Sequence, residues 1–203
     1  VKNAGQLNDV LQSLGFDPFN DLARVTFASP GGAEQDRGLI IVRGKFDTEK
    51  FKAKADEALK ANADALKVHK VPDGLGGQNL VYETVIPEQN LPIFIAVASK
   101  DVLLASPSKE YVADGLKKLN VANQPGLKNK DMQALLEKMD DKQSVSLAGL
   151  GSALAKGANL PAEAKDALEK LEAIGGGIAV TDEIKLQVVL ACKTAEDAKD
   201  IDK

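Results

Sequence analysis

Histidine and cysteine, the side chains that most often carry metal or nucleophilic chemistry, each occur once among the 203 residues. Cys192 continues an alternating apolar series that begins at Ile184, so we expect it to point inward at the end of a strand. A nucleophilic thiol needs exposure and a cationic neighbour, which makes a buried structural thiol the favoured interpretation. His69, beside Lys70, is expected to be a solvated strand residue, because one histidine cannot build a multi-histidine metal site.

Two pairs of acidic residues could in principle hold a metal or act as a general acid and base. They are Asp140 with Asp141, and Glu163 with Asp166. Acids near helix ends are usually solvated, and solvation is the interpretation adopted for both pairs. The sequence therefore assigns no catalytic residue, no cofactor-binding residue, no metal ligand and no cofactor.

Three glycine-containing segments raise the question of anion binding. The segment 74–77 leads into a strand rather than a helix, which favours a turn over a phosphate cradle. The segment 149–152 lies between a strand and a possible short helix, which makes it the better anion candidate, but no lysine follows it. The segment 175–177 is expected to permit close backbone packing or a bulge.

Hydrophobic periodicity predicts a first module over residues 1–122. An amphipathic helix places Leu7, Val10, Leu11 and Leu14 on one face, and a second helix capped by Asp47 or Thr48 has an inward face running to about Leu66. A third helix begins near Ser108. The predicted strands are 24–29, 38–42, 66–71, 79–86, 93–99 and 102–105.

A second, shorter module is predicted over residues 123–203, after a turn-rich linker at 123–126. Its first helix carries Met132, Leu135, Leu136 and Met139 inward, and a strand follows at 143–150. A helix beginning near Pro161 turns Leu168 and Leu171 inward. A hairpin of 174–180 with 184–190 leads to a last helix capped by Thr194.

The order of elements predicts the α+β class, with antiparallel sheets, helices packed on one face and two related hairpin-helix modules. The segments 42–51 (VRGKFDTEKF) and 189–198 (VLACKTAEDA) both pass from an apolar strand through a capped turn into a helix. The second module has fewer strands than the first. We therefore expect an apolar face around 184–190 that the module itself leaves exposed. Either the module is incomplete in this sequence, or a neighbouring molecule covers this face.

Charge and hydropathy limit the classes of partner. The chain has 26 basic and 30 acidic residues, a formal net charge of −4 that offers no general attraction to nucleic acid. The longest apolar runs, 39–42 and 93–98, are far shorter than the roughly 20 residues of a membrane-spanning helix. We expect no nucleic-acid partner and no transmembrane segment, and we expect a protein partner or self-association through the second module.

Four segments resemble a group of uncharacterised, exported or lipid-anchored proteins of planctomycete-type bacteria. They are 14–19 (LGFDPF), 21–26 (DLARVT), 102–112 (VLLASPSKEYV) and 142–147 (KQSVSL). The resemblance implies a secretion signal, further C-terminal residues in the native product, and a location in the periplasm or cell envelope. It implies no activity, substrate or site residue.

Together these observations predict a non-catalytic binding or structural protein of the bacterial cell envelope, whose ligand is unknown. The alternative is a carboxylate-based enzyme or a small-ligand carrier that uses a cleft between the modules. Convergent acids with perturbed pKa values in such a cleft would favour the alternative.

Overall fold

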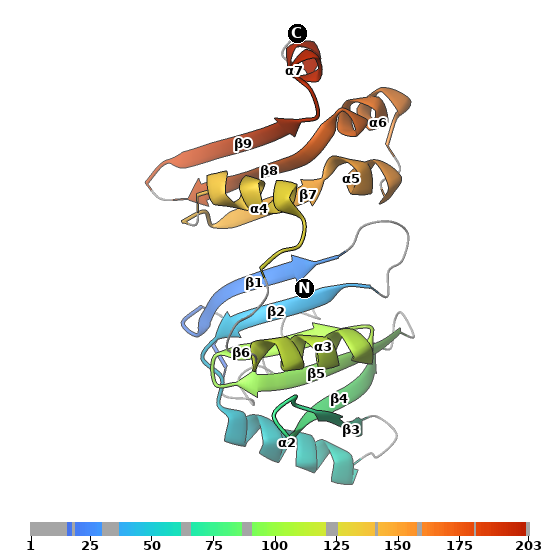
Figure 1. Ribbon diagram of the computed structural model, residues 1–203. Coiled ribbons are helices and arrows are strands. Elements are labelled where there is room, and N and C mark those ends of the chain that lie inside the picture. The colour runs from blue at the N-terminus through green and yellow to red at the C-terminus, as the bar shows by residue number, and fades with distance from the viewer. Residues whose placement is uncertain are drawn as a thin grey trace. The chain divides into compact units, whose positions relative to one another are not determined.

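The computed structural model describes residues 16–17, 19–29, 37–61, 66–86, 91–120, 126–140, 142–157, 160–180 and 182–201 (Figure 1). Described residues up to 120 belong to one compact unit, unit 1, and those from 126 belong to a second, unit 2. Each unit contains an antiparallel sheet and helices, which confirms the α+β class. The expected first helix at 7–14 and the expected boundary at 122–123 lie outside the described residues.

Unit 1 is built on a six-stranded sheet in the order β1-β2-β6-β5-β4-β3, in which all neighbouring strands are antiparallel. Strands that are consecutive in the sequence pair at β1-β2, β3-β4, β4-β5 and β5-β6. The strands are β1 (Leu22–Ala28), β2 (Leu39–Gly44), β3 (Lys67–Pro72), β4 (Gln78–Ile86), β5 (Leu91–Ser99) and β6 (Val102–Ser106).

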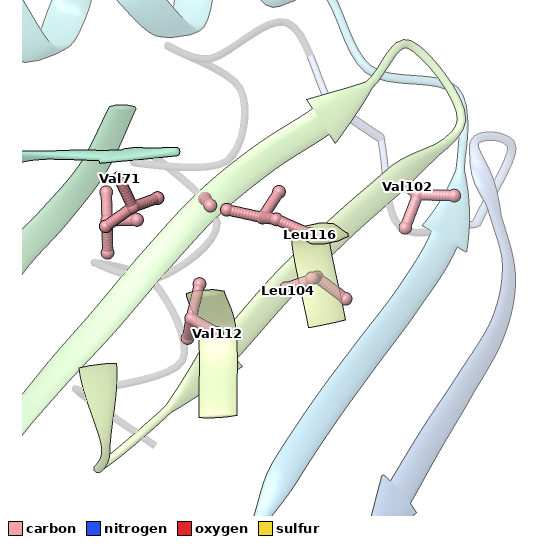
Figure 2. Close-up of a cluster of buried hydrophobic side chains, with 7 residues drawn as sticks. Val71, Val102, Leu104, Val112 and Leu116 are labelled. Atoms are coloured by element: carbon pink, nitrogen blue, oxygen red, sulfur yellow. The ribbon is translucent and has the colours of Figure 1, made fainter. Parts of the chain in front are cut away.

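Helix α3 (Lys109–Leu119) supplies the main core contacts of unit 1, and it packs against β5 and β6. Its residues Val112 and Leu116 are 0% and 2% exposed. Figure 2 shows them in one cluster with Val71, Val102 and Leu104, side chains that come from β3 and β6. This cluster fixes α3 on one face of the sheet.

Helix α2 (Thr48–Ala61) contacts the same sheet through Tyr82, the neighbour of the cluster residue Val81. Because successive strand residues point to opposite faces, Tyr82 lies on the face away from α3. Its ring meets Phe51 edge to face, with centroids 5.5 Å apart. Asp47 caps the helix by accepting a hydrogen bond from the Lys50 amide at 3.0 Å, as expected.

The glycine-rich segment after β3 forms a turn that leads into β4. Gly74 and Gly76 have φ values of 82° and 95°, a region where a side chain is strained. The Asp73 carboxylate accepts hydrogen bonds from the Leu75 and Gly77 amides, each at 2.8 Å. The expected turn is confirmed. Helix α2 ends before it was expected to, since Leu66 lies just outside β3 rather than on the helix.

Unit 2 has a three-stranded antiparallel sheet in the order β7-β8-β9. Two details of the expected helices are wrong. Leu136 is 42% exposed because Leu135 occupies the buried position, and Leu171 begins a strand instead of ending a helix. The elements are α4 (Lys130–Lys138), β7 (Val145–Leu150), α5 (Gly151–Gly157), α6 (Ala162–Glu169), β8 (Leu171–Val180), β9 (Ile184–Cys192) and α7 (Ala195–Ile201).

Helix α4 packs on one face of this sheet, over its central strand (Figure 1). A Cβ atom at Gly175 would lie 2.8 Å from the Met139 sulfur and 3.2 Å from Leu135, so glycine permits this close approach, as expected for the segment 175–177. The expected cap of α7 is also confirmed, because the Asp197 amide donates to the Thr194 hydroxyl at 3.0 Å.

We expect Leu116→Ala to lower the free energy of unfolding of unit 1 by about 2 to 5 kcal/mol, because it opens a cavity in the cluster. The matched control, Leu75→Ala at a position 74% exposed, should change it by less than about 0.5 kcal/mol. Both tyrosines, Tyr82 and Tyr111, lie in this unit and the chain has no tryptophan, so tyrosine fluorescence in urea follows it. Equal losses in the two variants would contradict the assigned core.

Candidate functional site

A polar cluster joins β3 and β4 on the same face as α3. Lys67 and Glu83 are opposite each other in the register, and His69 lies two residues farther along β3. The His69 Nε2 and Glu83 Oε2 atoms are 2.6 Å apart, and Lys67 Nζ lies 3.5 Å from Glu83 Oε1. The side chain of His69 is 30% exposed, so it is a half-buried partner of Glu83 rather than the solvated residue that the sequence predicted.

The electrostatics of this cluster favour an ionised Glu83. The hydrogen bond with His69 is the largest effect that lowers the pKa of the Glu83 carboxyl, burial opposes it, and the positive charge of Lys67 adds to the lowering. A carboxylate and imidazole pair can support acyl transfer only when a nucleophilic hydroxyl or thiol is hydrogen-bonded to the imidazole. Among the described residues, no hydroxyl or thiol is hydrogen-bonded to His69. Lys67, His69 and Glu83 therefore form cross-strand side-chain interactions that stabilise the pairing of β3 with β4.

The other residues singled out in the sequence lie in separate places. Glu163 and Asp166 are exposed on α6, and Asp140 accepts a hydrogen bond from the Lys142 amide at 2.9 Å, while Asp141 lies outside the described residues. Within the described ranges, no group of three His, Cys, Asp or Glu side chains could hold a metal. The segment 149–152 joins β7 to α5, whose seven residues form too short a helix for an anion site.

Cys192 is half-buried at the end of β9. It lines a shallow hollow with Leu190 and with Ala198 and Ile201 of α7. The neighbours Leu190, Ala198 and Ile201 are apolar, and Lys199 also borders the hollow. The expected burial is not found, because the strand alternation places Cys192 on the same side as Leu186 and Val188, which are exposed, and Cys192 itself is only partly buried.

The most prominent surface of unit 2 is the face of its sheet that points away from α4. In the register, Leu147, Gly176 and Val188 form one row across the three strands, and the next row is Val145, Ile178 and Leu186. We call this surface the open face, because its large side chains are between 38% and 75% exposed. Its members are Val145, Leu147, Ile178, Ile184, Leu186, Val188 and Leu190.

The two faces of this sheet differ in the size of their side chains. The face under α4 carries small residues in its central rows, such as Ala148 and Gly175, which let the helix approach. The open face carries leucine, isoleucine and valine. An antiparallel sheet with one covered face normally alternates apolar with polar residues, so that the other face is solvated. Here the larger apolar side chains point away from the helix.

Among the described residues of unit 2, helices border the open face at one end. Leu154 of α5 lies close to Gly149, because a Cβ atom there would be 2.9 Å from a Leu154 methyl group. Residues of α7 lie beside Leu190 at the same end of the sheet. The opposite end contains Ile184 and Leu186, which are both 75% exposed.

The expected exposure around 184–190 is thus confirmed, but the sequence analysis missed the contribution of β7. Val145 and Leu147 are 63% and 70% exposed beside Ile178 and Gly176. The alternation of VSLAGL was a usable signal, because it places Val145 and Leu147 on a single face once the pairing with β8 is known. None of the helices in the described residues has the length and apolar character needed to cross a bilayer.

We expect Glu83→Gln to destabilise unit 1 by about 1 kcal/mol at neutral pH, because it weakens a charge-assisted hydrogen bond and an ion pair. The folded-state pKa of Glu83 lies below its ordinary value of 4.5. Its stabilisation is therefore complete above about pH 4.5 and is lost as the pH falls through the folded-state pKa. Tyrosine-monitored urea unfolding from pH 7 to pH 3 measures this difference.

The matched control for that experiment is Glu57→Gln, which removes an exposed pair with Lys54. We expect a change of less than about 0.5 kcal/mol at any pH, because exposed ion pairs contribute little. A Glu83→Gln effect that stayed constant down to pH 3 would contradict the charge assignment.

We expect Leu186→Ala to change the stability of unit 2 in dilute solution by less than about 0.5 kcal/mol, because its side chain loses few contacts. Leu135→Ala should cost about 2 to 5 kcal/mol, because Leu135 is 1% exposed under α4. Cys192, the one cysteine of the chain, lies in unit 2, so urea-dependent labelling of its thiol reports unfolding. A large loss in Leu186→Ala would show that the open face is covered within one molecule.

Comparison with known proteins gives no assignment, since no protein-family model, no curated protein and no solved structure matches this chain.

Proposed function

We propose that this chain is a non-catalytic binding or structural protein of the bacterial cell envelope, and that the open face is its binding surface. The observation that carries the proposal is the exposure of seven large apolar side chains on one side of a single sheet. They come from all three strands and follow the register, so they form a continuous surface.

A surface of this kind is unfavourable in water and is therefore a sign of a contact. Apolar area that stays exposed forgoes about 25 cal/mol per Å² relative to burial. Isolated surface leucines are common, but a contiguous apolar patch on a folded unit marks an interaction site. The rows across β7, β8 and β9 contain glycine and aliphatic residues, so the contact available on this surface is apolar packing.

The envelope location rests on the resemblance of residues 14–19, 21–26, 102–112 and 142–147 to exported or lipid-anchored planctomycete-type proteins. Within the described part of the chain, three of these segments coincide with ordered elements, and the first of the three, 21–26, contains the start of β1. Residues 102–112 span β6 and the start of α3, and 142–147 lead into β7. The resemblance therefore concerns segments that build the fold.

The test is site-specific photo-cross-linking in the bacterium that encodes the chain. A photoreactive phenylalanine analogue replaces Leu186 on the open face. In a matched control it replaces Leu75, which is similarly exposed at 74% in unit 1. We expect a discrete adduct from position 186 in the envelope fraction and none from position 75.

A second substitution identifies the surface that makes the adduct. Adding Val188→Glu to the cross-linking variant should abolish the adduct, because it places a charge in an apolar contact. Adding Lys185→Glu, on the other face of β9, should leave it intact. A folded protein that gave no adduct at position 186, or that was recovered outside the envelope fraction, would contradict the proposal.

A further inference from the structure

We infer that the open face is the contact surface between two copies of this chain, which pack sheet against sheet about a twofold axis. The inference rests on the proposed function, because it names the partner of that same surface. Three features of the open face support a second copy as the occupant: its chemistry, its size and its relief.

The chemistry of the open face is uniform. Its three central rows contain Val145, Leu147, Ile174, Leu186, Val188 and similar aliphatic residues with two glycines, and none of their members is charged or polar. A twofold contact places a surface against itself, so every side chain must tolerate its own kind. A surface without charges meets this condition, because no ionised group is buried unpaired. A charged partner would find no counter-charge among these residues.

The size of the open face suits a dimer. The seven side chains are 38% to 75% exposed. Together they offer roughly 700 Å² per copy, close to the 800 Å² or so that each partner contributes to a standard interface. The largest apolar patches on monomers measure only about 300 to 600 Å².

The relief of the open face also suits sheet packing. Gly176 lies in the central strand between Leu147 and Val188, and Ile178 follows it on the same face. A glycine among larger neighbours leaves a recess that a branched side chain of the second copy can fill. Sheets packed face to face lie about 10 Å apart and interdigitate their side chains in this way.

Sedimentation velocity of the purified chain over a wide concentration range tests the inference. We expect a reversible equilibrium between monomer and dimer. Leu186→Glu should weaken the dimer at least about a hundredfold, because each interface would bury two unpaired carboxylates. Leu75→Glu, the control of equal exposure in unit 1, should leave the dissociation constant within about twofold.

A second measurement locates the twofold axis and does not depend on the folding of a charged variant. Ile178 lies at the centre of the open face, and the one native thiol is removed by Cys192→Ala. We expect Ile178→Cys in that background to be joined into dimers by a short bismaleimide. Leu75→Cys in the same background should give no covalent dimer.

Each other outcome overturns the inference. A chain that stays monomeric at high concentration has no second copy on this face, and a dimer unaffected by Leu186→Glu uses another surface. Assembly into open-ended oligomers excludes a closed twofold contact. The binding function of the open face and its occupation by a second copy can be disproved separately. An adduct at position 186 that contains a different protein would retain the binding function and remove the second copy.

Discussion

The alternation of side chains along β-strands is the constraint on which unit 2 depends. Each residue of β7, β8 and β9 is assigned to one of two faces, and the pairing register aligns these assignments across the sheet. Helix α4 covers only one face, and that face carries the smaller residues. A register slip of one residue would turn Leu186 and Val188 toward α4 and would turn Lys185 and Gln187 to the other face. The register that accommodates the helix therefore also exposes the larger apolar side chains.

In unit 1 the apolar face of the corresponding strand is covered. Strand β2 pairs with strands on both sides, and Leu39 and Ile41 pack against the cluster under α3. In unit 2, β9 has β8 as its partner in the described sheet, and Leu186 and Val188 are exposed. Both strands lead into a helix capped by a side-chain oxygen, as the two sequence segments predicted. In unit 1 a helix covers the apolar residues of β2, whereas no helix among the described residues covers Leu186 and Val188 of β9. That the two modules are related stays a prediction.

Local patterns predicted the elements well, and long-range proximity was the part that they could not supply. The β8-β9 hairpin and the Thr194 cap follow from residues close together in the chain. The contact between His69 and Glu83 depends on the β3-β4 register across a glycine-containing turn, so a reading of local residues treated His69 as solvated. Leu136 was misplaced because adjacent helix residues point about 100° apart, and the packing of α4 on β8 buries Leu135 and leaves Leu136 at the edge of the contact. The open face was predicted for β9 from its alternating residues. The part contributed by β7 was missed, because it depends on the long-range pairing of β7 with β8.

Carbene footprinting read by mass spectrometry, at low and high protein concentration, shows whether the open face is exposed in one molecule and covered in the working protein. We expect strong labelling of Leu186 and Val188 in dilute solution and protection at high concentration, with Leu75 labelled equally in both. Labelling of Leu186 as weak as that of Leu135 in dilute solution would mean that the face is already covered within one molecule. Labelling of Leu186 that does not change with concentration would mean that no second copy covers it.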